Sequence, residues 1–372
     1  MCIRDRLPLS GRSPQISIML GKSAGGAVYA PVTTDFIVAV EGQAEMYVTG
    51  PAVIREVTGE DVSSAELGGA MQQEQNGNVS VTVPSEEEAF DFVRDLLGHL
   101  PTSSFDEPPV AWAPADEDLD DSALDEFMPD DTHAGYDMMD LLVQLGDDEE
   151  ILEIQENYAP NLICAIGRID GRPVGFVANN PMHFAGCIDA DAADKGARFI
   201  QICDAYNLPL IFVVDTPGYL PGVDQEKVGL IHRGAKLAFS VVQSTVPKIS
   251  LIVRKAYGGA YAVMGSKNLS GDLNFAWPTA QIAVMGSAAA AVMIQGKQLA
   301  AIEDETQRNA MKKVFMDFYE ENMTSPYVAT ERGYLDGMIQ PSETRLTLRR
   351  ALRQLSTKYE ADLPKKHNIH PL

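Results

Sequence analysis

A long internal repeat constrains the fold of this chain more than any other feature of its sequence. Residues 16–29 read I-S-I-M-L-G-K-S-A-G-G-A-V-Y and residues 249–262 read I-S-L-I-V-R-K-A-Y-G-G-A-Y-A, so six of fourteen positions are identical. A second matched pair, A-E-M-Y-V-T-G-P (44–51) and A-Q-I-A-V-M-G-S (280–287), follows in the same order at nearly the same spacing. Two matches in register indicate duplication of a large domain rather than a short solenoid repeat.

Each copy of the repeat has the pattern of an α/β unit: an apolar strand, a Gly-Gly turn, a helix, and a second apolar strand that ends in Gly. Further elements precede the second Gly-Gly, with strands expected at 162–169, 173–178 and 210–214 and helices at 192–206 and 227–243. Asp170-Gly171 predicts a tight hairpin turn between the first two of these strands. Strands that alternate with helices predict an α/β fold.

The two copies differ in the length of chain that precedes them. About 100 residues lead to the second Gly-Gly and about 20 to the first, so the first domain is expected to be incomplete and the chain N-terminally truncated, by about 80–100 residues. Residues 1–8 begin M-C-I-R-D-R and contain no apolar signal-peptide core. We expect this opening segment to be non-native.

The charge of the chain is concentrated in one stretch. The net charge is −24, and residues 116–156 contain 17 Asp or Glu and no Lys or Arg. The residues around the start of this stretch are rich in Pro, Ser and Thr, so we expect a solvated acidic linker at 116–135. It would join a partial N-terminal domain (1–115) to a C-terminal domain (136–372). A docking site for a basic partner is the alternative for this stretch.

The composition excludes several function classes. A net charge of −24 argues against nucleic-acid binding and against docking on anionic lipid. No apolar run approaches the ~18 residues of a membrane helix. Cys2, Cys164, Cys187 and Cys203 form no C-x-x-C and no zinc spacing, which predicts reduced thiols in a cytosol-like compartment and no metal. Nucleotide-binding and serine-hydrolase motifs are missing, and the six histidines are scattered, so no general base is evident.

The duplicated Gly-Gly turn is the strongest candidate for chemistry. Glycines allow a sharp turn and close approach of a ligand, and the first N–H groups of the following helix are unpaired. Two such groups directed at one point form an oxyanion hole, suited to a thioester enolate or a ureido oxygen. The alternative is a tight turn without a ligand.

These residues lie in blocks that resemble the carboxyltransferase (β) subunit of biotin-dependent acyl-CoA carboxylases, most closely the propionyl-CoA carboxylase type. The blocks are G-K-S-A-G-G-A-V-Y-A-P (21–31), V-T-G-E-D-V-S-S-A-E-L-G-G-A (57–70), K-G-A-R-F-I-Q-I-C-D-A-Y-N-L-P-L (195–210), D-T-P-G-Y-L-P-G (215–222), R-K-A-Y-G-G-A-Y (254–261) and F-A-W-P-T-A-Q-I-A-V-M-G (275–286). The resemblance implies two crotonase-like domains (ClpP/crotonase superfamily) and a homo-hexamer, a dimer of trimers, in the cytoplasm.

The resemblance also implies an activity: transfer of a carboxyl group from carboxybiotin, carried on a biotin carboxylase/carrier α subunit, to the α-carbon of an acyl-CoA. The biotin ureido anion would take the α-proton. Gly25 and Gly26 would hold the thioester enolate oxygen, and Gly259 and Ala260 the biotin ureido oxygen. One site would combine the N-terminal domain of one subunit with the C-terminal domain of another.

Further site residues follow from the same resemblance. Those expected to line the substrate pocket are Ala185, Gly186, Cys187, Tyr257 and Ala262. Those expected on the biotin side are Gly218, Tyr219, Leu220 and Gly222. An ordinary βα turn at 185–187 and a packing ridge at 215–222 are the alternatives.

Two departures from the family pattern bear on the substrate. Ala262 stands where propionyl-type relatives often have Asp, and Ala288-Ala289 stand where the family's M-G-x-E-G-A has Glu-Gly. Propionyl-CoA is therefore the first expectation and acetyl-CoA the second. The alternatives are the carboxyltransferase subunit of a sodium-pumping acyl-CoA decarboxylase, and a non-catalytic homologue.

Overall fold

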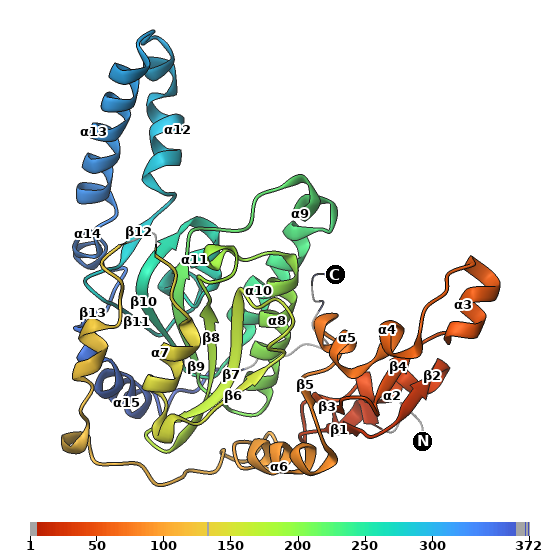
Figure 1. The fold of residues 1–372 in the computed structure, drawn as a ribbon. Helices are drawn as coiled ribbons and strands as arrows, with labels where there is room; N and C mark the ends of the chain where they lie inside the picture. The colour runs from red at the N-terminus through yellow and green to blue at the C-terminus, as the bar shows by residue number, and fades with distance from the viewer. Residues whose placement is uncertain (1–5, 132–133, 362–368, 370, 372) are drawn as a thin grey trace.

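The structure is a computed structural model that describes residues 6–131, 134–361, 369 and 371. A large lobe, built around one extended sheet, is joined to a smaller N-terminal lobe (Figure 1). Of the segment expected to be non-native, residues 1–5 lie outside the described residues, and Leu7–Leu9 form a short 3-10 helix.

The large lobe contains an eight-stranded sheet in the order β13-β11-β10-β9-β8-β7-β6, with β12 paired to the end of β10. Its strands are β6 (Ile151–Ile154), β7 (Leu162–Ile169), β8 (Arg172–Asn179), β9 (Leu210–Thr216), β10 (Lys248–Tyr257), β11 (Leu273–Ala276), β12 (Gln281–Ala283) and β13 (Gly337–Met338). The pairs β6–β7 and β7–β8 are antiparallel, and the remaining pairs are parallel.

The helices of the large lobe are α7 (Met138–Leu145), α8 (Ala190–Ala205), α9 (Val223–Lys227), α10 (Leu230–Gln243), α11 (Gly258–Val263), α12 (Ser287–Ala300), α13 (Glu305–Met323), α14 (Pro326–Glu331) and α15 (Thr344–Gln354). Of these, α8 and α10 pack on one face of the sheet and α7 and α15 on the other. In β7, Leu162, Cys164 and Ile166 enter the core that contains α8 and α10, whereas Ile163 and Ala165 enter the core that contains α7 and α15. Side chains alternate across a strand, so burial on both faces explains the near-continuous apolar sequence of the central strands.

The strands and helices expected ahead of the second Gly-Gly are confirmed. The three strands are β7, β8 and β9, and the two helices are α8 and α10. The second helix begins at Leu230 rather than near 227, because Gly229 adopts φ +84° and separates α9 from α10. The predicted hairpin turn is also present, with φ +59° at Asp170 and +70° at Gly171.

The small lobe contains a parallel sheet, β1-β3-β5, and a parallel pair, β2-β4. Its strands are β1 (Ile16–Met19), β2 (Lys22–Ala24), β3 (Phe36–Val40), β4 (Glu45–Tyr47) and β5 (Val81–Val83). Its helices are α2 (Tyr29–Val32), α3 (Pro51–Thr58), α4 (Ser64–Gly68), α5 (Ala70–Gln75) and α6 (Glu86–Leu97). Its core centres on β3, which is buried along its whole length.

Strand pairing in the small lobe is reproduced in the large one. β1 pairs with β3 as β10 pairs with β11, with Ile16 opposite Phe36 and Ile249 opposite Leu273. β2 then pairs with β4 as the end of β10 pairs with β12. In that second pairing Lys22 lies opposite Glu45 and Lys255 opposite Gln281, which are equivalent positions of the sequence repeat. In both lobes a last parallel strand, β5 or β13, extends the sheet.

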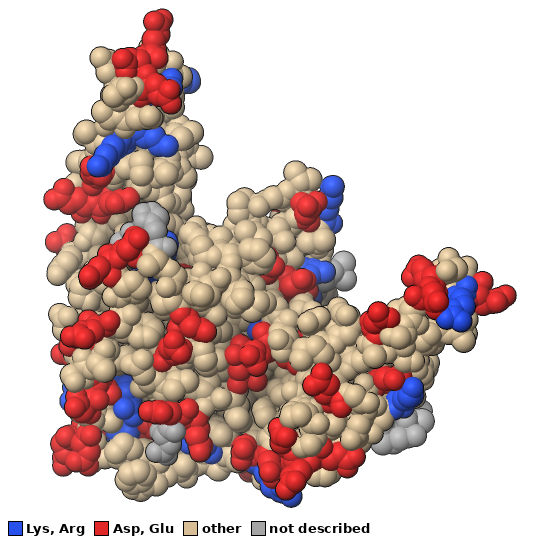
Figure 2. Space-filling view, viewed as in Figure 1, with Lys and Arg blue, Asp and Glu red and all other residues tan. Residues whose placement is uncertain are grey.

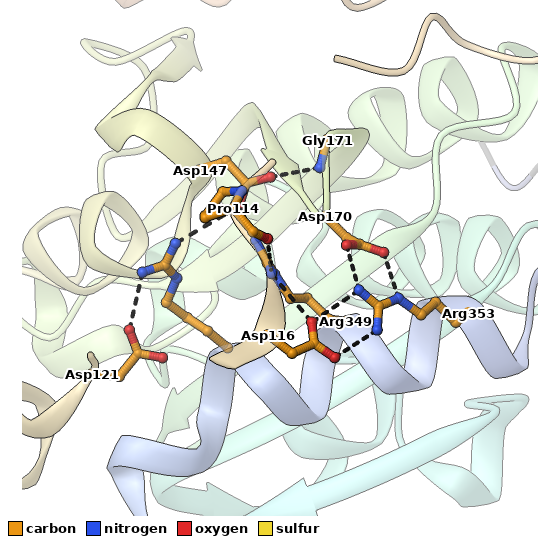
Figure 3. Close-up of polar contacts among 9 residues, drawn as sticks. Pro114, Asp116, Asp121, Asp147, Asp170, Gly171, Arg349 and Arg353 are labelled. Carbon is orange, nitrogen blue, oxygen red and sulfur yellow. Dashed lines mark hydrogen bonds and ion pairs between the residues drawn. The ribbon is translucent and has the colours of Figure 1, made fainter. Parts of the chain in front are cut away.

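The sequence predicts a solvated linker at 116–135, but part of this acidic segment packs against the large lobe. Asp116 forms ion pairs with Arg349 and Arg353 of α15, and Asp121 with Arg345 (Figure 3). These contacts arise because Arg345, Arg349 and Arg353 follow one another along α15 at intervals of four residues and so lie on one face. Within the same segment, the short 3-10 helix Ser122–Glu126 places Leu124 in the core beside α15. Residues 132–133 lie outside the described part of the chain.

The same arginine face contacts the β7–β8 hairpin. Arg349 is fully buried and pairs with Asp147, which in turn accepts the Gly171 N–H at 2.7 Å. Arg353 forms a two-bonded ion pair with Asp170, at 2.7 Å for each bond. Hydrogen bonding to Arg353 also lowers the pKa of Asp116.

The two lobes meet at the chain segment that follows β6. The Gln155 N–H donates to Ser80 O at 2.6 Å, and buried Glu74 accepts hydrogen bonds from the backbone and side chain of Asn157. From the other side, the buried ammonium of Lys195 donates to Gln155 O and Tyr158 O, each at 2.8 Å. This segment is therefore held by both lobes at once.

The helical hairpin α12–α13 projects from the large lobe (Figure 1). Several of its apolar side chains are exposed, among them Val292, Met293, Ile294, Val314 and Phe318. Acidic side chains gather elsewhere on the visible surface, along the α6 edge and at the tip of α3 (Figure 2). No helix in the described part of the chain is both long and apolar enough to cross a lipid bilayer.

Candidate active site

The second Gly-Gly turn lies where β10 ends and α11 begins. Gly258 adopts φ +58°, and a Cβ atom there would lie 2.8 Å from Val284 O, so this position requires glycine. Gly259 is exposed and Ala260 is buried. Because they are among the first residues of α11, their N–H groups have no intrahelical acceptor.

The first Gly-Gly turn has the same backbone form. Gly25 adopts φ +63° where β2 ends and the 3-10 helix Gly25–Val28 begins, and a Cβ atom on Gly25 or Gly26 would meet open space, with no neighbouring atom within 4 Å. By conformation Gly25 corresponds to Gly258 and Gly26 to Gly259. Ala27 therefore corresponds to Ala260. It is not among the residues predicted from the sequence, although the repeat aligns the two.

Tyr219 lies beside the second turn. A Cβ atom on Gly259 would be 3.8 Å from Cε2 of Tyr219. The ring also packs on α10, where a Cβ atom on Gly234 would be 3.0 Å from the Tyr219 hydroxyl oxygen, so glycine inside this helix makes room for it. Burial raises the pKa of Tyr219 to about 12, so its hydroxyl remains protonated at neutral pH.

The turn at 185–187 is joined to the same region through the next residue, Ile188. The Ile188 N–H donates to Gly218 O at 3.1 Å, and the Leu220 N–H donates to Ile188 O at 2.8 Å. Gly186, at φ +76°, is required because a Cβ atom there would lie 2.3 Å from Asp215 O. Ala185, also at positive φ, is exposed. The structure thus brings the predicted 185–187 turn, the Gly218–Leu220 loop and Gly259 together.

Cys187, within the 185–187 turn, and the predicted residues Tyr257 and Gly222 differ in burial. Cys187 is half-buried, and burial raises the pKa of its thiol, which does not favour a nucleophilic thiolate. Tyr257 is buried, and its hydroxyl donates to Gln281 Oε1 at 2.5 Å, so this group is used within the β10–β12 pair. Gly222 is exposed at the far end of its loop, at φ +154°.

A cavity of about 590 Å³ opens on the other side of the second turn. It is lined by Gly258, Gly259, Tyr261, Asn268, Ile282, Ala283, Val284, Tyr319, Met323, Val328, Ala329, Arg332 and Tyr334. The small lobe has a cavity of about 420 Å³ that is lined by β4 and by Val28 and Tyr29, which follow its own Gly-Gly turn. Ala262, the residue proposed to select the acyl chain, lies half-buried in α11, one residue beyond Tyr261.

A buried polar cluster below the second turn was not predicted. Asp215 at the end of β9 pairs with Arg254 of β10 at 2.9 Å, and Tyr136 donates a hydrogen bond to the same carboxylate at 2.8 Å. The signal in the sequence was an arginine within the apolar run of β10. A charged residue in a central strand needs a buried partner.

The two Gly-Gly turns do not share one site within a single chain. The first lies beside β2 in the small lobe and the second at the end of β10 in the large lobe (Figure 1). Among the residues that the structure describes, no group of three or more His, Cys, Asp or Glu side chains is placed to hold a metal ion.

The carboxyl transferase domain matches residues 4–369, almost the entire chain. The chain belongs to the carboxyl transferase domain family. This membership confirms the resemblance drawn from the sequence blocks around both Gly-Gly turns.

The names of curated relatives of this carboxyl transferase domain mention several classes of acyl-CoA. A long-chain acyl-CoA carboxylase β4 subunit of Mycobacterium tuberculosis is 50% identical, over 94% of this chain and 67% of the relative. An acetyl-/propionyl-CoA carboxylase β5 subunit of Mycobacterium leprae is 47% identical, over 99% of this chain and 69% of the relative. The α subunit of methylmalonyl-CoA decarboxylase from Veillonella parvula is 43% identical, over 98% of this chain and 69% of the relative.

A solved structure has the same fold as this carboxyl transferase domain. The transcarboxylase 12S core, a hexamer crystallised with methylmalonyl-CoA, superposes with a TM-score of 0.94 at 40% identity. The match covers 100% of this chain and 70% of the other. The α/β fold of the chain is therefore that of a carboxyltransferase.

Proposed function

We propose that this chain is the carboxyltransferase subunit of a biotin-dependent acyl-CoA carboxylase. Its substrate would be a short-chain acyl-CoA, propionyl-CoA first and acetyl-CoA second. The observation that carries the proposal is the pair of Gly-Gly turns at equivalent places of two lobes, each with its first glycine at a similar positive φ, because the reaction involves two oxyanions.

The architecture proposed with this function is two crotonase-like domains related by duplication, the first incomplete. The equal strand registers of the two lobes support it. The boundaries proposed from the sequence are 1–115, a connection at 116–135, and 136–372. The contacts of Asp116, Asp121 and Leu124 favour assigning this connection to the large lobe.

The residues of the large lobe fit a biotin ring. Tyr219 offers a half-buried aromatic face beside Gly259, and the N–H groups of Gly259 and Ala260 have no intrahelical acceptor. Carboxybiotin, bound on a partner subunit, would supply the carboxyl group, and the ureido nitrogen freed by its loss would take the α-proton. Gly259 and Ala260 would hold the ureido oxygen, and the loop Gly218–Gly222 would face the ring.

The turn of the small lobe would hold the thioester oxygen. Gly25, Gly26 and, by equivalence with Ala260, Ala27 are the donors considered. Because the two turns lie in separate lobes, the complete site would combine lobes of two copies, as in a homo-hexamer built as a dimer of trimers. The partners would be a biotin carboxylase/carrier α subunit and acyl-CoA, in the cytoplasm.

The test is a carboxyl-transfer assay of the protein with its carboxybiotinylated partner over acetyl-, propionyl- and butyryl-CoA. Formation of the corresponding malonyl-type thioester, with highest kcat/KM for propionyl-CoA, is the expected result. Transfer only in the reverse direction, dependent on membrane decarboxylase subunits, would favour the decarboxylase alternative. No transfer in either direction by the folded protein would reject the proposal.

A further inference from the structure

A buried ion pair links the two segments that form the second site. Asp215 starts the 215–222 loop and Arg254 lies four residues before Gly258, and their side chains are 1% and 6% exposed. The Arg254 Nε donates to Asp215 Oδ2 at 2.9 Å. Burial of both charges means that each is held by protein groups and not by solvent.

The pair lies at an irregularity of the sheet. β9 and β10 pair regularly from Lys248 opposite Leu210 to Ile252 opposite Val214, and pairing resumes with Ala256 opposite Thr216. β10 therefore has two extra residues at this point. Asp215 Oδ1 accepts the Lys255 N–H at 3.0 Å, so the carboxylate replaces the ladder bond that the bulge removes.

A third segment completes the cluster. The Tyr136 hydroxyl donates to Asp215 Oδ2 at 2.8 Å, and its ring lies 4.8 Å from the Arg254 guanidinium. Arg254 also donates to Ala134 O at 2.8 Å. Each carboxylate oxygen of Asp215 is thus bonded, and the bulge is fixed from β9, from β10 and from the chain that precedes α7.

We propose that Asp215, with Arg254 and Tyr136, positions the N–H donors of the Gly258–Ala260 turn. This inference rests on the proposed function, since it concerns the oxyanion site of that reaction. The bulge sets the direction in which the last residues of β10 deliver Gly258. A small error there displaces donors that must point at one oxygen, and a misplacement of about 1 Å can reduce a rate about 100-fold.

Stability alone does not account well for this cluster. Buried ion pairs contribute little net stability, because desolvation of the two charges offsets their attraction. Among the described residues, none of the hydrogen bonds of Asp215, Arg254 and Tyr136 reaches Gly258–Ala260, so they are positioning residues and not catalytic ones. Their effect should therefore appear in the rate of the chemical step.

The test compares Asp215→Asn and Tyr136→Phe with the control Asp204→Asn in the full protein. Asp204 is a half-buried carboxylate that holds the chain just ahead of β10, where it accepts the Thr245 N–H at 2.6 Å and the Val246 N–H at 3.2 Å. The length of β10 separates Asp204 from the turn. Each variant is measured for melting temperature, for kcat and acyl-CoA KM, and for deuterium uptake of residues 254–264.

We expect Asp215→Asn to lower kcat about 10- to 100-fold and Tyr136→Phe by a smaller factor, with KM for acyl-CoA unchanged. Uptake in 254–264 should rise in both. Asp204→Asn should lower the melting temperature and leave kcat and this uptake unchanged. Equal kcat in all three folded variants, or a rise in KM at constant kcat, would overturn the inference.

Two measurements keep this result separate from the proposed function. Failure of the wild-type protein to transfer carboxyl groups rejects the function, whereas the deuterium uptake still decides whether the cluster fixes the turn. If Asp215→Asn does not fold, Tyr136→Phe alone decides. That variant keeps the ring under Arg254 and removes only one hydrogen bond.

Discussion

Tyr219 lies against Gly259, so close that a Cβ atom on Gly259 would be 3.8 Å from the Tyr219 ring. The contact joins a loop after β9 to the turn after β10. A methyl group fits at this distance, whereas a branched side chain adds further atoms beside the ring and in front of the turn. Substitutions at Gly259 can therefore test whether ligands need access to the turn without unfolding the protein.

Gly259→Val should abolish carboxyl transfer while the protein remains folded and assembled. The larger side chain fills the space in front of the turn, and loss of one oxyanion donor costs about 2.7–4 kcal/mol in the transition state. Gly259→Ala is the matched control and should retain much of the activity. The assay is single-turnover transfer with purified, correctly assembled variants. Turnover of the valine variant at the wild-type rate would remove Gly259 from the site.

Gly258→Ala and Gly25→Ala should differ in stability although both residues have positive φ. At Gly25 the added methyl meets open space, so only the left-handed conformation costs energy, about 1–2 kcal/mol. At Gly258 the methyl would also lie 2.8 Å from Val284 O, which adds about 1–3 kcal/mol of overpacking. Chemical denaturation of both variants checks this, and equal losses would contradict the close contact.

Ala262→Asp should change the ratio of kcat/KM for acetyl-CoA and propionyl-CoA. Ala262 is half-buried in α11, three residues beyond Gly259. One methylene in an apolar pocket is worth about 1–3 kcal/mol, so the expected shift is about 10- to 200-fold. Both constants are measured for both proteins under one set of conditions. An equal change for both substrates would show that Ala262 does not select the acyl chain.

Arg349→Met should destabilise the large lobe by about 3–5 kcal/mol, because it leaves the buried Asp147 without its main counter-ion. Arg353→Met is the control on the same helix. Its ion pairs with Asp116 and Asp170 are partly exposed, with 43% of the Arg353 side chain accessible, so a loss of about 1 kcal/mol or less is expected. Urea denaturation distinguishes the two, and similar losses would show that burial of Arg349 is not decisive.

The free energy of unfolding should fall as the pH rises from about 5 to 8, because Glu153 loses a proton in the folded state over this range. Burial raises the pKa of Glu153 to about 7, opposed by nearby Lys195, so the folded state binds a proton that the unfolded state has already released. A raised carboxyl pKa lowers stability above the unfolded value and most strongly above the folded one. Glu153→Gln should therefore be more stable than wild type at pH 8, by about 1–3 kcal/mol, and about equal at pH 4. Parallel unfolding curves at both pH values check the sign.

The sequence was sufficient for features that depend on local pattern. The Gly-Gly turns, the Asp170-Gly171 hairpin and the central strands were all predicted, because glycine conformation and apolar runs are local properties. Equivalent positions of the repeat also pair in the same way, Lys22 with Glu45 and Lys255 with Gln281. Equivalent strands pair in both lobes because the two copies of a duplicated domain share one fold.

Contacts between distant segments could not be predicted in the same way. Asp215 and Tyr136 are 79 residues apart, and no sequence pattern in either segment predicts their contact. The acidic run at 116–135 gave no sign of its partner on α15, although arginines four residues apart at Arg345, Arg349 and Arg353 were visible in the sequence. A run of like charges considered by itself predicts exposure to solvent. Only the folded structure shows that the arginine face of α15 lies opposite part of this run.

The attachment of the acidic connection to α15 decides where the chain can be cut. A C-terminal fragment that starts at residue 136 would lose Asp116 and Asp121 and leave the arginine face of α15 without these counter-ions. It would also lose the backbone hydrogen bond from the Ala111 N–H to Gly171 O. A fragment that starts near residue 108 keeps all of these contacts. The shortest autonomous piece of the large lobe is therefore expected to begin inside the proline-rich stretch, ahead of the acidic residues.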